Sequence, residues 1–208
     1  MDFKDGLIAA YDADAQRRVS NEDIRDAWKI DSRNRFGELV VENGGKTLIE
    51  LGAGVGLDSA YFQNDLGLQV TATDLSPKMV DECLKRGLVA KVVDLYELTK
   101  FTERVDAIYS MNVLLHVPRE DLEGVLSEIF KSLNENGLFF YGVYGGKDEE
   151  KTITDPTKMK MPRYFSFLSD NSILEAVSNF FEVIEFKKVP MGSKDPNFYF
   201  QSLILKKK

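Results

Sequence analysis

The sequence predicts a doubly wound α/β fold, in which helices cover both faces of a mostly parallel sheet. Short apolar runs alternate along the chain with segments of helical periodicity. The first run, at 48–51, enters a turn with glycine at every second position, Gly52, Gly54 and Gly56. The second, at 69–73, ends in an acid, Asp74. Such alternation builds βαβ units, which predict a three-layer α/β/α structure.

Each element has its own local signal. Apolar, β-branched or aromatic runs predict seven strands, at 48–51, 69–73, 90–93, 105–110, 138–144, 181–189 and 197–205. Helical periodicity and capping residues predict helices at 57–64, at 78–86 behind Ser76-Pro77, from Pro118 to Asn136-Gly137, and near 171–180. The polar, lysine-rich stretch 145–161 is expected to be a long loop. Because residues 190–196 connect the last two runs as a hairpin, the final strand should be antiparallel.

Composition favours one globular domain of 208 residues, with 43% hydrophobic and 29% charged residues. No apolar run has the length of a membrane span. Cys83 is the only cysteine, so the chain has no internal disulfide, and a cytoplasmic location is expected. The net charge of −7 makes a long nucleic acid an unlikely partner. Whether the chain is a monomer or a homodimer stays open.

The glycine turn and Asp74 together predict a nucleoside site. Glycine lets a ligand approach the backbone, and an acid at the end of the next strand can accept hydrogen bonds from ribose hydroxyls. The dinucleotide pattern needs a third glycine at position 57, where Leu57 stands. This difference counts against a nicotinamide cofactor.

The segment from Glu50 to Gly56 resembles motif I of the class I S-adenosylmethionine (SAM)-dependent methyltransferases. Similar matches follow in order: Asp94-Leu95, the segment 109–118 after the fourth strand, and Asn134–Gly137. The resemblance implies a Rossmann-like sheet of seven strands whose last strand is antiparallel and inserted between two others. It implies SAM as cofactor and S-adenosylhomocysteine as product. It places these residues at the cofactor: Tyr11, Glu50, Gly52, Ala53, Gly54, Gly56, Asp58, Asp74, Leu75, Met79, Asp94, Leu95, Met111, Asn112 and Val113.

The resemblance also divides the single domain, residues 1–208, into three parts. Residues 1–44 would form a helical lid, 45–144 the cofactor-binding core, and 145–208 a substrate-side loop, a helix and a C-terminal hairpin. The segment Arg163-Tyr-Phe-Ser166 resembles small bacterial methyltransferases of methyltransferase type 11, near the tellurite-resistance-like group.

The implied reaction is in-line transfer of the SAM methyl group to N, O or S of a small molecule, with positioning supplying most of the rate. His116, the only histidine, is the candidate base. Tyr144 and Arg163 are expected to face the acceptor, and an arginine there suits an anionic group. No metal is required. Three alternatives stay open: a tRNA or protein methyltransferase on the same fold, an NAD-dependent oxidoreductase, and a SAM-binding module without catalysis.

Overall fold

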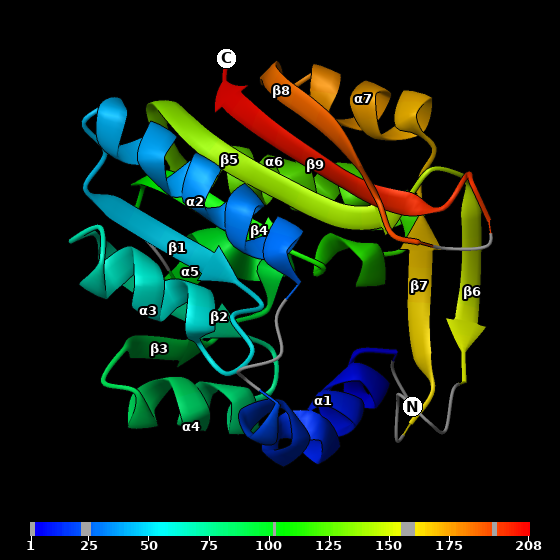
Figure 1. Ribbon diagram of the computed structural model, residues 1–208, viewed down its shortest axis with the longest axis horizontal. Coiled ribbons are helices and arrows are strands. Elements are labelled where there is room, and N and C mark those ends of the chain that lie inside the picture. The colour runs from blue at the N-terminus through cyan, green and yellow to red at the C-terminus, as the bar shows by residue number, and fades with distance from the viewer. Residues whose placement is uncertain (1–2, 22–25, 102, 155–160, 193–194) are drawn as a thin grey trace.

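The computed structural model describes residues 3–21, 26–101, 103–154, 161–192 and 195–208. A seven-stranded sheet forms its centre (Figure 1). The strands, in spatial order, are β3 (Val89–Val92), β2 (Gln69–Asp74), β1 (Thr47–Leu51), β4 (Val105–Met111), β5 (Leu133–Gly145), β9 (Tyr199–Lys207) and β8 (Phe181–Pro190). The pairings from β3 to β5 are parallel, whereas β9 is antiparallel to both β5 and β8. The predicted doubly wound sheet with an inserted antiparallel last strand is therefore confirmed.

Helices cover both faces of the sheet. They are α1 (Phe3–Ser20), α2 (Ala27–Glu42), α3 (Leu57–Asn64), α4 (Pro77–Lys85), α5 (Leu98–Phe101), α6 (Leu122–Ser132) and α7 (Asp170–Ser178), with short 3₁₀ turns η1 (Leu95–Glu97), η2 (Leu114–His116) and η3 (Arg119–Asp121). Ser76 caps α4 by accepting the Met79 N–H, and Pro77 occupies its first position, as predicted.

Alternation along the strands divides the core into two layers. On one face, Leu48 and Tyr109 pack with Phe36 of α2 and Phe62 of α3. On the other face, neighbouring strand residues pack with α6 and α7, as Ile49 and Ile108 do. Since successive strand residues point to opposite faces, a strand buried on both sides reads as a continuous apolar run.

Two local expectations were wrong. Residues 145–161 were expected to be a loop, but Glu149–Ile153 forms β6, which pairs antiparallel with β7 (Arg163–Phe167). The sequence of β6 is too polar to show the alternation of apolar and polar residues that predicts a strand. Its pairing partner, β7, lies outside the stretch 145–161. In addition, α6 ends at Ser132 rather than at Asn136-Gly137, because Leu133 already pairs with Val105. The ladder then shifts register, and Asn136 adopts a left-handed conformation with φ 64°.

Helix α1 stands apart from the sheet, on the side toward which β1 points (Figure 1). It contacts both α4 and β7. This position brings α1 over the carboxyl ends of the central strands, where ligands bind in open α/β sheets. None of the described helices combines the length and hydrophobicity that a membrane span requires.

Candidate active site

A cavity of about 570 Å³ lies between the carboxyl ends of the strands, α1 and β7. All but two of the predicted site residues line it. The exceptions are Gly56, the residue before α3, and Met79, which is fully buried in α4 beneath α1. These two support the wall of the cavity from behind.

The glycine turn leaves bare backbone at the cavity wall. Gly52 and Gly54 have φ values of 63° and 55°, in the left-handed region that favours glycine. A Cβ at Gly52 would lie 2.4 Å from a Val113 methyl carbon, a severe clash. At Gly54, a Cβ would instead project into space, with Arg18 Nη1 as its neighbour at 4.0 Å. The turn thus needs glycine for two reasons, packing at Gly52 and backbone conformation at Gly54.

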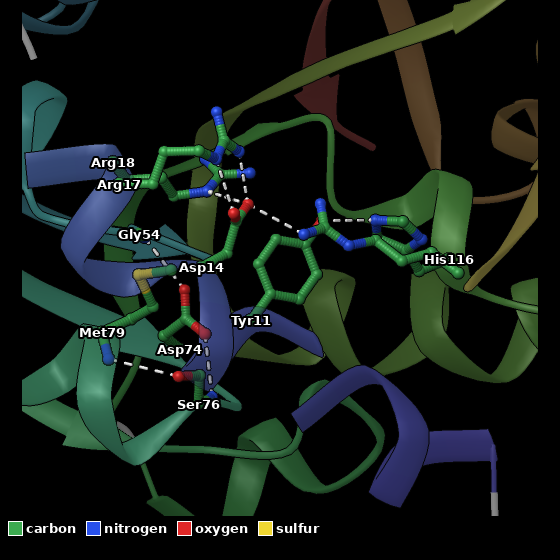
Figure 2. A network of polar contacts seen from close by, with 10 residues as sticks. Tyr11, Asp14, Arg17, Arg18, Gly54, Asp74, Ser76, Met79 and His116 are labelled. Carbon is green, nitrogen blue, oxygen red and sulfur yellow. Dashed lines mark hydrogen bonds and ion pairs between the residues drawn. The ribbon is translucent and has the colours of Figure 1, made fainter. Parts of the chain in front are cut away.

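Asp74 ends β2 beside this turn. One carboxylate oxygen accepts the Gly54 N–H at 2.9 Å, and the other accepts the Ser76 N–H at 2.9 Å (Figure 2). Burial raises the pKa of Asp74 above its usual value, although the two N–H donors oppose the shift. Because each carboxylate oxygen has two lone pairs, the group retains acceptor capacity toward the cavity.

Two further polar residues, Asn112 and Asp94, line the cavity. Asn112 follows β4 with φ 60°, and its side-chain oxygen is buried with no hydrogen-bond partner among the described residues. Asp94 follows β3, and its carboxylate lies 2.6 Å from Lys4 Nζ of α1. Lys4 also lies over the Tyr96 ring, 3.7 Å from its centroid. Through these two contacts α1 covers the part of the cavity that Asp94 and Tyr96 line.

The other acidic site residues are held in place. Glu50 is almost fully buried and accepts a hydrogen bond from Ser59 of α3. Asp58, in the first turn of α3, has Arg33 3.6 Å away. Ala53, Leu75, Leu95 and Met111 complete the cofactor set along the wall. Among the described residues, no cluster of three or more His, Cys, Asp or Glu side chains is arranged for a metal ion.

Tyr11 and His116 meet across the cavity. His116 Nδ1 lies 2.7 Å from the Tyr164 carbonyl oxygen of β7, and Nε2 lies 2.7 Å from the Tyr11 hydroxyl. A carbonyl oxygen can only accept, so Nδ1 carries the proton and Nε2 accepts from Tyr11. Burial lowers the pKa of His116 to about 4, so the ring is neutral at pH 7.

An ion cluster centred on Asp14 of α1 adjoins this pair (Figure 2). Asp14 is completely buried and accepts two hydrogen bonds from Arg17 and one, of 2.8 Å, from Arg163 of β7. Arg18 Nε is 3.6 Å away. Burial alone would raise the pKa of Asp14, but hydrogen bonds from Arg17 and Arg163 outweigh it and hold the pKa at about 2.

Sequence reasoning missed Lys4, Asp14 and Arg18. Together with Leu7 and Tyr11, they recur along α1 at spacings of three and four, which places them on one face of the helix. That face is polar where a helix packed on a core would be apolar. The signal in the sequence was that polar residues occupy helix positions, spaced by three and four, where a helix packed on a core has apolar residues.

Comparison with known proteins supports one reading of this geometry. A family described as a methyltransferase domain matches residues 49–141. The chain is 25% identical over 142 residues to phosphoethanolamine N-methyltransferase 2 of Caenorhabditis elegans, a match that covers 63% of this chain and 30% of that protein. The chain therefore spans less than a third of the length of this curated relative.

Solved structures share the fold over nearly the whole chain. Magnesium protoporphyrin IX methyltransferase from Synechocystis, with bound SAM, superposes with a TM-score of 0.71 at 15% identity, covering 100% of this chain and 98% of that one. A 1,6-didemethyltoxoflavin-N1-methyltransferase from Burkholderia thailandensis, with S-adenosylhomocysteine, gives 0.65 at 20% identity, covering 98% and 90%. Residues 49–141 thus match a methyltransferase domain, and the chain has the fold of SAM-dependent methyltransferases. The match to a methyltransferase domain favours SAM over a nicotinamide dinucleotide as the cofactor.

The residues that line the cavity fit SAM. Gly54 leaves open backbone beside Asp74, which suits a ribose. The unpartnered Asn112 oxygen is an acceptor that an ammonium group would satisfy. When bound, SAM supplies a methyl group already activated by its sulfonium. The roles of the individual site residues remain predictions.

Proposed function

We propose that this chain transfers the methyl group of SAM to a nitrogen atom of a small molecule that carries an anionic group. The observation that carries the proposal is Arg163. It is 6% exposed, it lines the cavity, and its Nε atom has no hydrogen-bond partner among the described residues. A buried, incompletely paired guanidinium is costly, so a ligand anion would satisfy it.

The relatives support nitrogen as the acceptor atom. The curated matches are phosphoethanolamine N-methyltransferases from a nematode and from plants. Phosphoethanolamine combines an amine with a phosphate, and the phosphate is an anionic group of the kind that Arg163 favours. It is therefore the first acceptor to test.

The protein's own groups can promote such a transfer without a covalent intermediate. Arg163 would orient the acceptor by its anion, and α1 would exclude water from the cavity. An amine must lose a proton before it can attack. His116 Nε2 is the candidate proton acceptor, and because it holds the Tyr11 hydroxyl, the proton would reach it through that hydroxyl or after the hydroxyl moves.

The test compares two amines that differ by one phosphate group. Purified protein is incubated with SAM and either phosphoethanolamine or ethanolamine, and S-adenosylhomocysteine release is measured. We expect kcat/KM to be at least about 100-fold higher for phosphoethanolamine. Ethanolamine cannot form the buried, charge-assisted hydrogen bond to Arg163, and the loss of such a bond costs about 3 kcal/mol. Arg163→Gln should remove most of this difference.

Product analysis decides the acceptor atom. Mass spectrometry and NMR of the product should show an N-methyl group. Equal rates for the two amines would refute the anionic requirement. If neither amine reacts, a panel of carboxylate-bearing amines tests the same chemistry, and methylation confined to O or S acceptors would contradict the proposal.

A further inference from the structure

Arg18 of α1 lies beside Gly54 of the glycine turn. Its Nη1 atom lies 4.0 Å from the position of a Cβ at Gly54, and no other described side chain or backbone atom beyond the adjacent residues lies within that distance. The charge of Arg18 opposes the raised pKa of Asp74 and also acts on Tyr11 and His116. Arg18 therefore faces the cofactor side of the cavity, from the helix above it.

The cluster to which Arg18 belongs has too few carboxylates. Asp14 already accepts hydrogen bonds from Arg17 and Arg163, and Arg18 Nε stands 3.6 Å away without a hydrogen-bond partner among the described residues. A single buried carboxylate thus faces three guanidinium groups. The surplus positive charge borders the cavity, and an anion placed there would be stabilised.

The floor of the cavity has the opposite sign. Glu50 and Asp74 line it, and the Asn112 oxygen adds a neutral acceptor. The amino-acid end of SAM carries both an ammonium and a carboxylate. Acceptors on the floor suit the ammonium, whereas a carboxylate against Glu50 or Asp74 would be repelled.

We infer that Arg18 binds the carboxylate of the methionine part of SAM. Arg18 and Arg163 then have separate partners, the cofactor and the acceptor. The inference rests on SAM as cofactor and not on the identity of the acceptor, so it survives if the proposed acceptor chemistry fails.

Two ligands that differ in the amino-acid end test the inference. S-adenosylhomocysteine has the carboxylate, and 5′-methylthioadenosine has the same thioether nucleoside without it. Calorimetric titration gives the dissociation constants of both for the wild-type chain, Arg18→Gln and Arg17→Gln. We expect Arg18→Gln to weaken S-adenosylhomocysteine at least about 10-fold and 5′-methylthioadenosine by less than about 2-fold, as for one charge-assisted hydrogen bond.

Arg17→Gln is the matched control, because it removes the same charge from the same helix. Arg17 also borders the cavity, but its side chain is 44% exposed and has no atom within 4 Å of a Cβ at Gly54, so Arg17→Gln should change both affinities equally and by less than about 3-fold. Arg18→Lys retains the charge and should recover part of the S-adenosylhomocysteine affinity.

Several results would overturn the inference. Equal loss of both ligands in Arg18→Gln would mean that Arg18 shapes the cavity or holds α1 without contacting the carboxylate. An unchanged affinity would exclude the contact. Selective loss in Arg163→Gln instead would assign the carboxylate to that residue. If Arg18→Gln loses its cooperative thermal transition, the affinities of Arg18→Lys and the salt dependence of binding to the wild-type chain test the inference instead. The affinity for S-adenosylhomocysteine, which has the carboxylate, should then fall steeply with salt, and the affinity for 5′-methylthioadenosine should not.

Discussion

At the residue scale, two buried carboxylates differ in environment: Asp74 lines the cavity, and Asp14 lies in the neighbouring ion cluster. Asp74 is held by backbone N–H groups and has a raised pKa because it is buried. Asp14, equally hidden from solvent, has a pKa of about 2 because guanidinium groups surround it. The difference fits their positions, Asp74 beneath the predicted ribose and Asp14 as a fixed charge within α1.

We predict that Asp74→Ala weakens SAM binding by roughly 1–3 kcal/mol, the cost of leaving polar partners unpaired. Titration calorimetry with S-adenosylhomocysteine measures it. Because Asp74 also accepts the Gly54 and Ser76 N–H groups, the melting temperature must be followed in parallel. An unchanged affinity in a folded variant would show that the ribose lies elsewhere.

At the element scale, α1 is held down by polar contacts with segments that are distant in sequence. Lys4 pairs with Asp94, Tyr11 bonds His116, Asp12 accepts the Ser76 hydroxyl, and Asp14 pairs with Arg163. Only Leu7, Ala10 and Ala15 are buried apolar residues of this helix. Such a helix can detach at a lower free energy than the core, as a lid requires.

Asp14→Ala should release this helix. The substitution leaves Arg163 buried without its carboxylate, and breaking a buried ion pair typically costs about 3–5 kcal/mol. Hydrogen exchange followed by mass spectrometry should show faster exchange in peptides from residues 3–20, with β1 and β4 still protected. Arg17→Ala, which removes an exposed partner of the same Asp14, serves as the control. Uniformly faster exchange across the sheet would mean that Asp14 supports the whole fold rather than the lid.

At the scale of the whole molecule, His116 links stability to pH. The pKa of His116 in the folded chain, about 4, lies below the value of 6.5 expected in the unfolded chain, so the unfolded state binds more protons between these two pH values. The resulting stabilisation is present above pH 6.5 and is lost as the pH falls toward 4. The shift corresponds to roughly 3 kcal/mol.

Denaturant unfolding of the wild type and His116→Gln between pH 7.5 and 4 isolates this contribution. The wild type should lose roughly 3 kcal/mol more unfolding free energy than the variant across that interval. Parallel pH profiles would show that the folded pKa of His116 is close to its unfolded value. The single histidine also allows direct NMR titration.

The sequence by itself determined the strands of the sheet and the glycine turn. These features depend on short-range rules: apolar runs for strands, Ser76-Pro77 at a helix start, and glycines where the backbone needs a positive φ. The resemblance to known methyltransferases then supplied the candidate cofactor residues and the insertion of the last strand between two others, which spacing alone does not give.

Only the tertiary structure decided how α1 is used and which groups it brings together. Arg163, which binds Asp14, and His116, which binds Tyr11, lie 149 and 105 residues away along the chain. The polar face of α1 has these partners only after the chain has folded. The same holds for β6, whose strand character depends on pairing with β7. Contacts between distant segments cannot be read from local periodicity, because their free energy arises only when the chain has folded.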